Sequence, residues 1–183
     1  EKYEKISNEL VKAVGESRVR SIMADSQNQL WVCTYSGLFC QDAQGTIHFY
    51  NQENSQTTSD RFRCITELRD GSVAVGTADG VNLIRDEKLT GTLTSEEGLA
   101  NTQILSIVEG KDGTIWAGSD GSGIYLISDG KLIGNYTDQD GLSSNVILRI
   151  VPYEKGYLIV TSNALCHMDL ERNIKKLDKF PYF

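Results

Sequence analysis

Arginine residues recur at two matching positions of this sequence. Arg18 and Arg20 are separated by one residue, and Arg61 and Arg63 repeat that spacing 43 residues later. A guanidinium group is planar and always charged, so it suits carboxylate, sulfate or uronic-acid groups. The spacing therefore raises the hypothesis of an anion-binding rim. The favoured alternative is that these arginines are solvated and pair with the chain's own carboxylates.

Three amide side chains precede strands at related positions of the sequence. Asn101, Gln103 and Asn145 fall in predicted loops, where amides either contact a ligand or bond to the loop backbone, which is their commoner role. Arg149 follows Asn145 by four residues, in the fourth copy of the repeat described below. The predicted ligand-binding residues are therefore Arg18, Arg20, Arg61, Arg63, Asn101, Gln103, Asn145 and Arg149.

Residues with catalytic or metal-binding chemistry are sparse. Two histidines, His48 and His167, leave little for a zinc site, and the four cysteines form no C-x-x-C pair. No nucleophile-elbow or histidine-based motif occurs, so we expect no catalytic residue, no metal and no cofactor. Cys33 and Cys40 flank a short predicted hairpin, where they form a disulfide in an oxidising compartment or, more commonly, remain buried thiols.

These side chains must be positioned by a repeat that runs through the chain. Four apolar runs each end in a hydroxyl residue, at intervals of 43, 42 and 42 residues. They are Leu30–Thr34, Val73–Thr77, Ile115–Ser119 and Tyr157–Thr161. An isoleucine lies twelve residues before the hydroxyl in the first three copies and eleven before it in the fourth, and a turn residue lies between the two. The turn residues are Asn28, Gly71, Gly113 and Gly156.

Each repeat therefore predicts four antiparallel strands. The second strand is apolar throughout, which is typical of a strand covered on both faces, and such sheets stack into a β-propeller. We expect an all-β fold with blades at 18–59, 60–100, 101–143 and 144–183, and with 1–17 forming the outer strand of a preceding blade or a linker. Tyr3 and Ile6 suit that outer strand, while 7–14 has some helical character. Trp31 and Trp116 fall in second strands, which favours core packing over sugar stacking.

Composition excludes several classes of protein. The chain has 183 residues, of which 39% are hydrophobic and 23% charged, as in folded soluble domains. A net charge of −7 argues against a nucleic-acid binder, which needs a basic surface. No apolar stretch reaches the length of a membrane span.

The repeat resembles the two-component regulator propeller repeat. The third copy carries the resemblance best, through Gly98-Leu99, Ile104, Ile107, Asp112-Gly113, Ile115-Trp116-Ala117-Gly118-Ser119 and Gly123-Ile124-Tyr125. The second and fourth copies depart from it, with Ala74 and Leu158 in place of tryptophan. The resemblance covers roughly 18–178. It implies the extracytoplasmic input region, in the periplasm or at the cell surface, of a membrane-anchored bacterial sensor with a histidine kinase or, in some relatives, a diguanylate cyclase.

The expected function is therefore non-catalytic ligand sensing, with a small anionic or saccharide ligand. Four repeats are fewer than such rings usually contain, so open blade faces also predict a homodimer or a partial ring. A propeller scaffold for protein–protein binding is the second interpretation. A propeller lyase or glycosidase ranks last, because the inner-strand positions supply arginines but no recurring carboxylate.

Overall fold

The computed structural model describes residues 8–177, which form four separate four-stranded antiparallel sheets. In each sheet the strands follow one another in chain order, so every blade is a simple meander. The predicted all-β fold of four-stranded blades is confirmed. The strand expected around Tyr3 and Ile6 lies outside the described residues.

The strands of each blade run in sequence order from the inner edge outward. Blade 1 contains β1 (Val19–Ala24), β2 (Leu30–Thr34), β3 (Leu38–Gln41) and β4 (Ile47–Tyr50). Blade 2 contains β5 (Phe62–Glu67), β6 (Val73–Thr77), β7 (Gly80–Arg85) and β8 (Lys88–Leu93). Blade 3 contains β9 (Ile104–Glu109), β10 (Ile115–Ser119), β11 (Ile124–Ser128) and β12 (Lys131–Tyr136). Blade 4 contains β13 (Ile147–Tyr153), β14 (Gly156–Thr161), β15 (Leu165–Asp169) and β16 (Ile174–Lys176).

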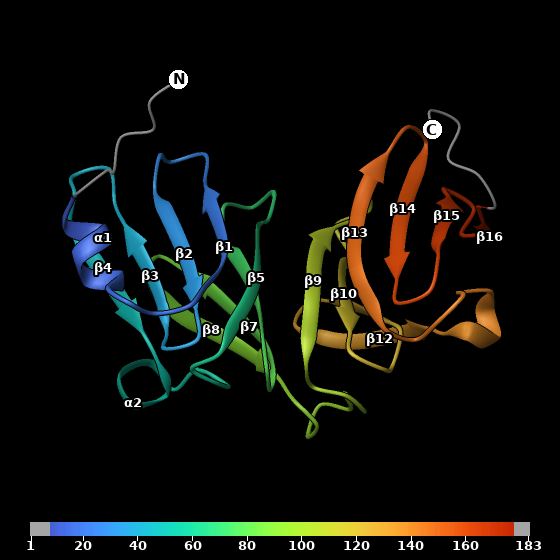
Figure 1. Ribbon diagram of the computed structural model, residues 1–183, viewed down its shortest axis with the longest axis horizontal. Coiled ribbons are helices and arrows are strands. Elements are labelled where there is room, and N and C mark those ends of the chain that lie inside the picture. The colour runs from blue at the N-terminus through green and yellow to red at the C-terminus, as the bar shows by residue number, and fades with distance from the viewer. Residues whose placement is uncertain (1–7, 178–183) are drawn as a thin grey trace.

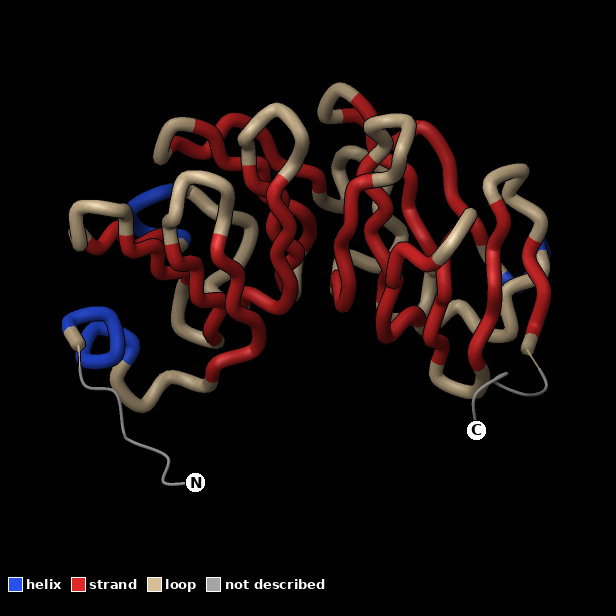
Figure 2. The backbone as a smooth tube through the Cα atoms, turned by 90° about the horizontal axis from the view of Figure 1, so that it is seen from above, coloured by secondary structure: helices blue, strands red, loops and turns tan. Residues whose placement is uncertain are grey.

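The blades follow one another in an open row, with blade 1 and blade 4 at opposite ends (Figure 1). Seen from above, the sheets stand side by side and short loops join their edges (Figure 2). The inner strands β1, β5, β9 and β13 contact one another in that order. Their first residues therefore share one rim of the molecule, where the predicted arginines lie. The linkers between blades include α2 (Gln52–Ser55) and the 3₁₀ turn η1 (Asp138–Asp140).

The recurring hydroxyl residue closes the turn between the second and third strands. Thr34, Thr77, Ser119 and Thr161 are all buried. Each donates a hydrogen bond to a backbone carbonyl three or four residues later, at 2.8 to 3.1 Å. The same oxygens accept backbone N–H groups of the turn. The hydroxyl satisfies buried backbone groups of the turn, which explains why a threonine or serine recurs at this position in every blade.

The turn between the first and second strands follows the predicted pattern in three blades. Asn28, Gly71 and Gly113 have φ of 60°, 79° and 85°, in the left-handed region that asparagine and glycine adopt most easily. In blade 4, however, Glu154 has the positive φ, and Gly156 begins β14 instead. The expectation that Gly156 is a turn residue is wrong, because Glu154 and Lys155 form the turn and Gly156 pairs with Tyr153 in the ladder. Glycine is required there because an added Cβ would lie 2.1 Å from the Met168 carbonyl oxygen.

Each junction between neighbouring blades has its own hydrophobic core. One core joins blades 1 and 2, a second joins blades 2 and 3, and a third joins blades 3 and 4. At the later two junctions a glycine of the second strand lies against the first residue of the next inner strand. A Cβ on Gly76 would lie 2.6 Å from Ile104, and one on Gly118 would lie 2.6 Å from Ile147. The absence of a side chain at these glycines is what lets the blades approach so closely.

A short helix, α1 (Glu9–Val14), packs on the outer face of blade 1. Its Leu10 is buried against Val32 and Phe39. Residues 9–14 are therefore helical, as the sequence indicated for 7–14. The helix covers only part of the face, and Ile22, whose counterparts Ile107 and Ile150 are buried, remains 67% exposed. Within the described part of the chain, no helix has both the length and the apolar character needed to cross a bilayer.

Candidate functional site

A β-bulge occurs at the same position of all four inner strands. In blade 1 the pairing skips from Val19 to Ser21, which leaves Arg20 without a partner in the ladder. In blade 2 it skips from Phe62 to Cys64, which leaves Arg63. A bulge bends the strand and changes the direction of the extra side chain. Two of the four predicted rim arginines are therefore the residues that a bulge redirects.

Three arginines converge on one aromatic ring that the sequence did not single out. The Cζ atoms of Arg18, Arg20 and Arg63 lie 5.4, 5.5 and 5.8 Å from the ring centroid of Tyr35. These distances are within the range of cation–π attraction. We call Tyr35, Arg18, Arg20 and Arg63 the arginine cluster. It spans blades 1 and 2, because Tyr35 directly follows β2 and Arg63 belongs to β5.

Arg63 also connects the cluster to blade 3. Its Nη2 donates a hydrogen bond to Oε1 of Gln103 at 2.8 Å, and Gln103 in turn donates to the Asp120 carboxylate. An open pocket of about 550 Å³ adjoins the cluster. Its lining residues are Tyr35, Gln52, Ser59, Asp60, Arg61, Ala78, Asp79 and Gln103. Arg61 thus faces the same space as Tyr35 and Gln103.

None of the five predicted arginines has a carboxylate partner among residues 8–177. The ion pairs in this part of the chain involve Lys12, His48, Arg69, Arg85 and Arg172. The interpretation in which the rim arginines pair with the chain's own carboxylates therefore finds no contact in the structure. Three guanidinium groups around one ring repel one another, and an anion would relieve that repulsion.

The remaining predicted residues divide between the rim and the loops. Asn101 donates to the Asp120 carbonyl oxygen at 2.6 Å, and Asn145 accepts from the Asp138 backbone N–H at 2.7 Å. Both amides hold loop backbone, so the structure does not bring them to the arginine cluster. Arg149 and Arg63 both act electrostatically on Cys64: burial raises the pKa of this thiol to about 12, and the two arginines oppose the rise.

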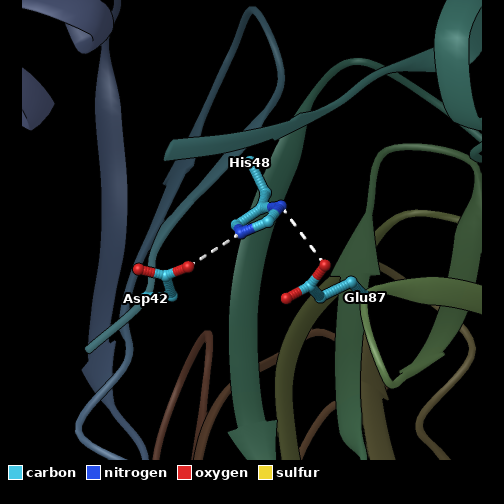
Figure 3. Close-up of side chains that lie close together, drawn as sticks. All are labelled: Asp42, His48 and Glu87. Atoms are coloured by element: carbon cyan, nitrogen blue, oxygen red, sulfur yellow. Dashed lines mark hydrogen bonds and ion pairs between the residues drawn. The ribbon is translucent and has the colours of Figure 1, made fainter. Parts of the chain in front are cut away.

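A second group of titratable side chains lies at a different place, between blades 1 and 2. Asp42, His48 and Glu87 point toward one another, with the imidazole ring between the two carboxylates (Figure 3). His48 Nε2 lies 3.3 Å from Asp42 Oδ2, and His48 Nδ1 lies 3.5 Å from Glu87 Oε2. These are the described residues whose atoms could hold a metal ion. No motif connects them, since Glu87 belongs to another repeat.

All four cysteines are buried free thiols. Cys33 lies opposite Leu38 in the β2–β3 ladder, and Cys40 lies opposite Trp31. The two cysteines that flank this hairpin therefore do not face each other. The structure agrees with the interpretation as buried thiols and not with the disulfide.

Comparison with known proteins agrees with this architecture. Residues 14–36 and 98–121 match the family model described as "Two component regulator propeller". No curated protein matches the sequence. The chain superposes on the extracellular domain of a protein named as a hybrid two component system from B. thetaiotaomicron, with a TM-score of 0.76 and 20% identity. That match covers 97% of this chain and 25% of the other.

An enzyme shares the same fold. Virginiamycin B lyase from Staphylococcus aureus superposes with a TM-score of 0.72 and 20% identity, over 92% of this chain and 57% of the lyase. Identities this low show the fold alone, and the chain spans only about a quarter of the length of the two-component structure. The resemblance expected from the sequence is nevertheless confirmed by the family match and by the blades: two segments of this chain are similar to the two-component regulator propeller repeat.

Proposed function

We propose that this chain is a non-catalytic, ligand-sensing segment of the extracytoplasmic input region of a bacterial transmembrane signalling protein, in which the output is a histidine kinase. The matched repeats and the fold shared with extracellular domains of two-component proteins support this role. The ligand is a small anion or an acidic saccharide. It binds at the arginine cluster, and signalling follows from a change in the packing of the blades that the cluster joins.

One observation carries the proposal: Arg18, Arg20 and Arg63 surround Tyr35 without any carboxylate partner among residues 8–177. Guanidinium groups in this arrangement offer several charge-assisted donors to one carboxylate or sulfate group. The adjoining pocket gives room for the rest of a ligand. Neither histidine lies at this rim, since His48 is in β4 and His167 in β15, so acid–base chemistry by imidazole has no place here.

The test is a binding titration with three sets of short oligosaccharides of equal length, which are uronic acids, sulfated sugars and neutral sugars. We expect an acidic set to bind and the neutral set not to bind. Arg20→Ala and Arg63→Ala should each weaken binding at least about tenfold, because each removes a charge-assisted contact. Arg20 is exposed, so its substitution leaves the core unchanged.

Arg85→Ala is the matched control, since Arg85 is an exposed arginine that pairs with Asp70 away from the rim. An equal loss of affinity in this variant would show that the ligand responds to net charge rather than to the arginine cluster. Absence of binding by every acidic sugar would contradict the proposal and favour a scaffold for protein–protein contact.

A further inference from the structure

The cluster of Asp42, His48 and Glu87 has the atoms and spacing of a metal site. One ligand atom from each residue lies within 4.8 Å of the other two. Zinc binds imidazole nitrogen and carboxylate oxygen at about 2.0–2.2 Å, which in tetrahedral geometry separates two ligand atoms by about 3.4 Å. The 3.3 Å between His48 Nε2 and Asp42 Oδ2 agrees with that separation, while Glu87 Oε2 lies 3.5 Å from the other ring nitrogen, Nδ1. Both distances exceed the length typical of charge-assisted hydrogen bonds.

The Asp42 side chain is fixed by the fold before any ion binds. Oδ1 of Asp42 accepts the backbone N–H groups of Gln44 and Thr46 at 2.9 and 2.8 Å, so that Oδ2 is left facing His48. His48 lies in β4, directly opposite the buried Cys40. The two hydrogen bonds to Asp42 Oδ1 hold a ligand side chain from behind, and such contacts raise metal affinity by fixing its direction.

Glu87 supplies the adjustable part of the cluster. It lies in the turn between β7 and β8 of blade 2, with φ of 61°, and its side chain is 51% exposed. The two carboxylates face different nitrogens of the imidazole, so one of them must turn to reach a shared ion. Glu87 has the freedom to do so, because its side chain contacts no other charged group than His48 among the described ion pairs.

The charge around the cluster favours a cation. No lysine or arginine among residues 8–177 pairs with Asp42 or Glu87, and the nearby Arg85 pairs with Asp70.

We propose that Asp42, His48 and Glu87 bind a divalent transition-metal ion of the zinc type, with water completing the coordination. The imidazole ligand selects against calcium, which takes six to eight oxygen ligands. Two ligands come from blade 1 and one from blade 2, so the ion links the two blades. This site is separate from the arginine cluster and does not depend on the function proposed for it.

The test is a calorimetric titration of the chain, first freed of metal with EDTA, with zinc chloride and separately with calcium chloride. We expect one zinc ion per chain and no comparable calcium binding. Glu87→Gln should lower zinc affinity at least about tenfold, as losing an orienting group alone does in other sites. Asp42→Asn should do the same while its Oδ1 still caps the turn.

Asp86→Asn is the matched control, because it removes the same charge from the neighbouring residue of the same turn and Asp86 is outside the cluster. It should keep the affinity of the unsubstituted chain. Zinc should also raise the melting temperature of the unsubstituted chain but not of Glu87→Gln, whose melting temperature in EDTA reports that it folds. No zinc binding, or equal losses in Asp86→Asn and Glu87→Gln, would overturn the proposal and leave an ion-pair contact between the blades.

Discussion

Trp31 and Trp116 occupy the same position in blades 1 and 3, and both are 3% exposed. Their indole N–H groups nevertheless differ. Trp31 Nε1 donates to Oδ2 of Asp25 at 2.8 Å. Gly110 takes the place of Asp25 in blade 3, and Trp116 Nε1 has no partner among the described residues. At the scale of single residues, one blade thus uses a polar contact where another relies on packing against Tyr157, whose ring centroid is 4.5 Å away.

Replacing each tryptophan by phenylalanine separates these two contributions. Both substitutions remove a similar apolar area, but only Trp31→Phe breaks a hydrogen bond to a charged group, which contributes about 1.5–3 kcal/mol. We expect Trp31→Phe to lower the free energy of unfolding by about 1–3 kcal/mol more than Trp116→Phe. Urea denaturation of the two variants measures the difference, and equal losses would contradict this account of Asp25.

Among the elements, the second strands set how closely the blades stack. β6 and β10 are buried at every position, and each contains a glycine that faces the next inner strand. Gly134, in the outer strand β12 of blade 3, is different, since its nearest neighbour would be a side-chain carbon of Leu126 at 3.5 Å. Glycines in one blade therefore have opposite tolerances to a side chain.

Gly118→Ala and Gly134→Ala test this difference within a single blade. A methyl group on Gly118 would meet Ile147, and overpacking of this kind lowers the free energy of unfolding by about 1–3 kcal/mol. Gly134→Ala should be neutral or stabilise slightly, because it restricts the unfolded chain and makes an ordinary contact. Thermal melts of both variants give the comparison, and a harmless Gly118→Ala would refute the close packing of blades 3 and 4.

On the scale of the whole molecule, charge is unevenly placed. The chain carries a net charge of −7, yet its arginine cluster gathers cations at one rim.

The cysteine thiols, by contrast, are buried away from water. Burial raises the pKa of Cys33 well above its ordinary value, and it raises the pKa of Cys40 and Cys64 to about 12. All three lie in the cores between blades.

These thiols should make the fold sensitive to alkaline pH. In the unfolded chain a thiol ionises near pH 8.5, whereas in the fold Cys64 keeps its proton to about pH 12. The unfolded state therefore binds fewer protons in this window, and stability falls as pH rises, by up to about 1.4 kcal/mol per pH unit for each thiol. Urea titrations at pH 7.5 and pH 9.5 measure the slope. It should become shallower in Cys64→Ala, and an identical slope there would contradict the assignment.

Much of the architecture was predictable because it repeats. A buried threonine or serine closes the same hairpin in every blade, so the same local pattern occurs four times in the sequence. The spacing of Arg18, Arg20, Arg61 and Arg63 likewise placed them at one rim. Gly156 shows the limit of a repeat as a guide, since a column can shift by two residues when a neighbouring residue takes the left-handed conformation.

What could not be predicted depends on contacts between repeats. Tyr35 corresponds to Ala78 in the next blade and so left no repeated signal. His48 and Glu87 come from different blades, and only the stacking of the sheets brings them together. The low number of histidines argued against a metal site, yet a single histidine is enough for the proposed site because carboxylates supply its other protein ligands, one of them from the neighbouring blade.

The separate core at each junction makes the stability of this fold the sum of a linear series of neighbour interactions. Opening one junction exposes only the core at that junction, and the cores at the other two junctions stay packed. The arginine cluster and the Asp42–His48–Glu87 cluster both bridge blades 1 and 2. Anything held there stiffens that one junction, so that the contact between blades 1 and 2 becomes an adjustable hinge while the later junctions keep their own rigidity.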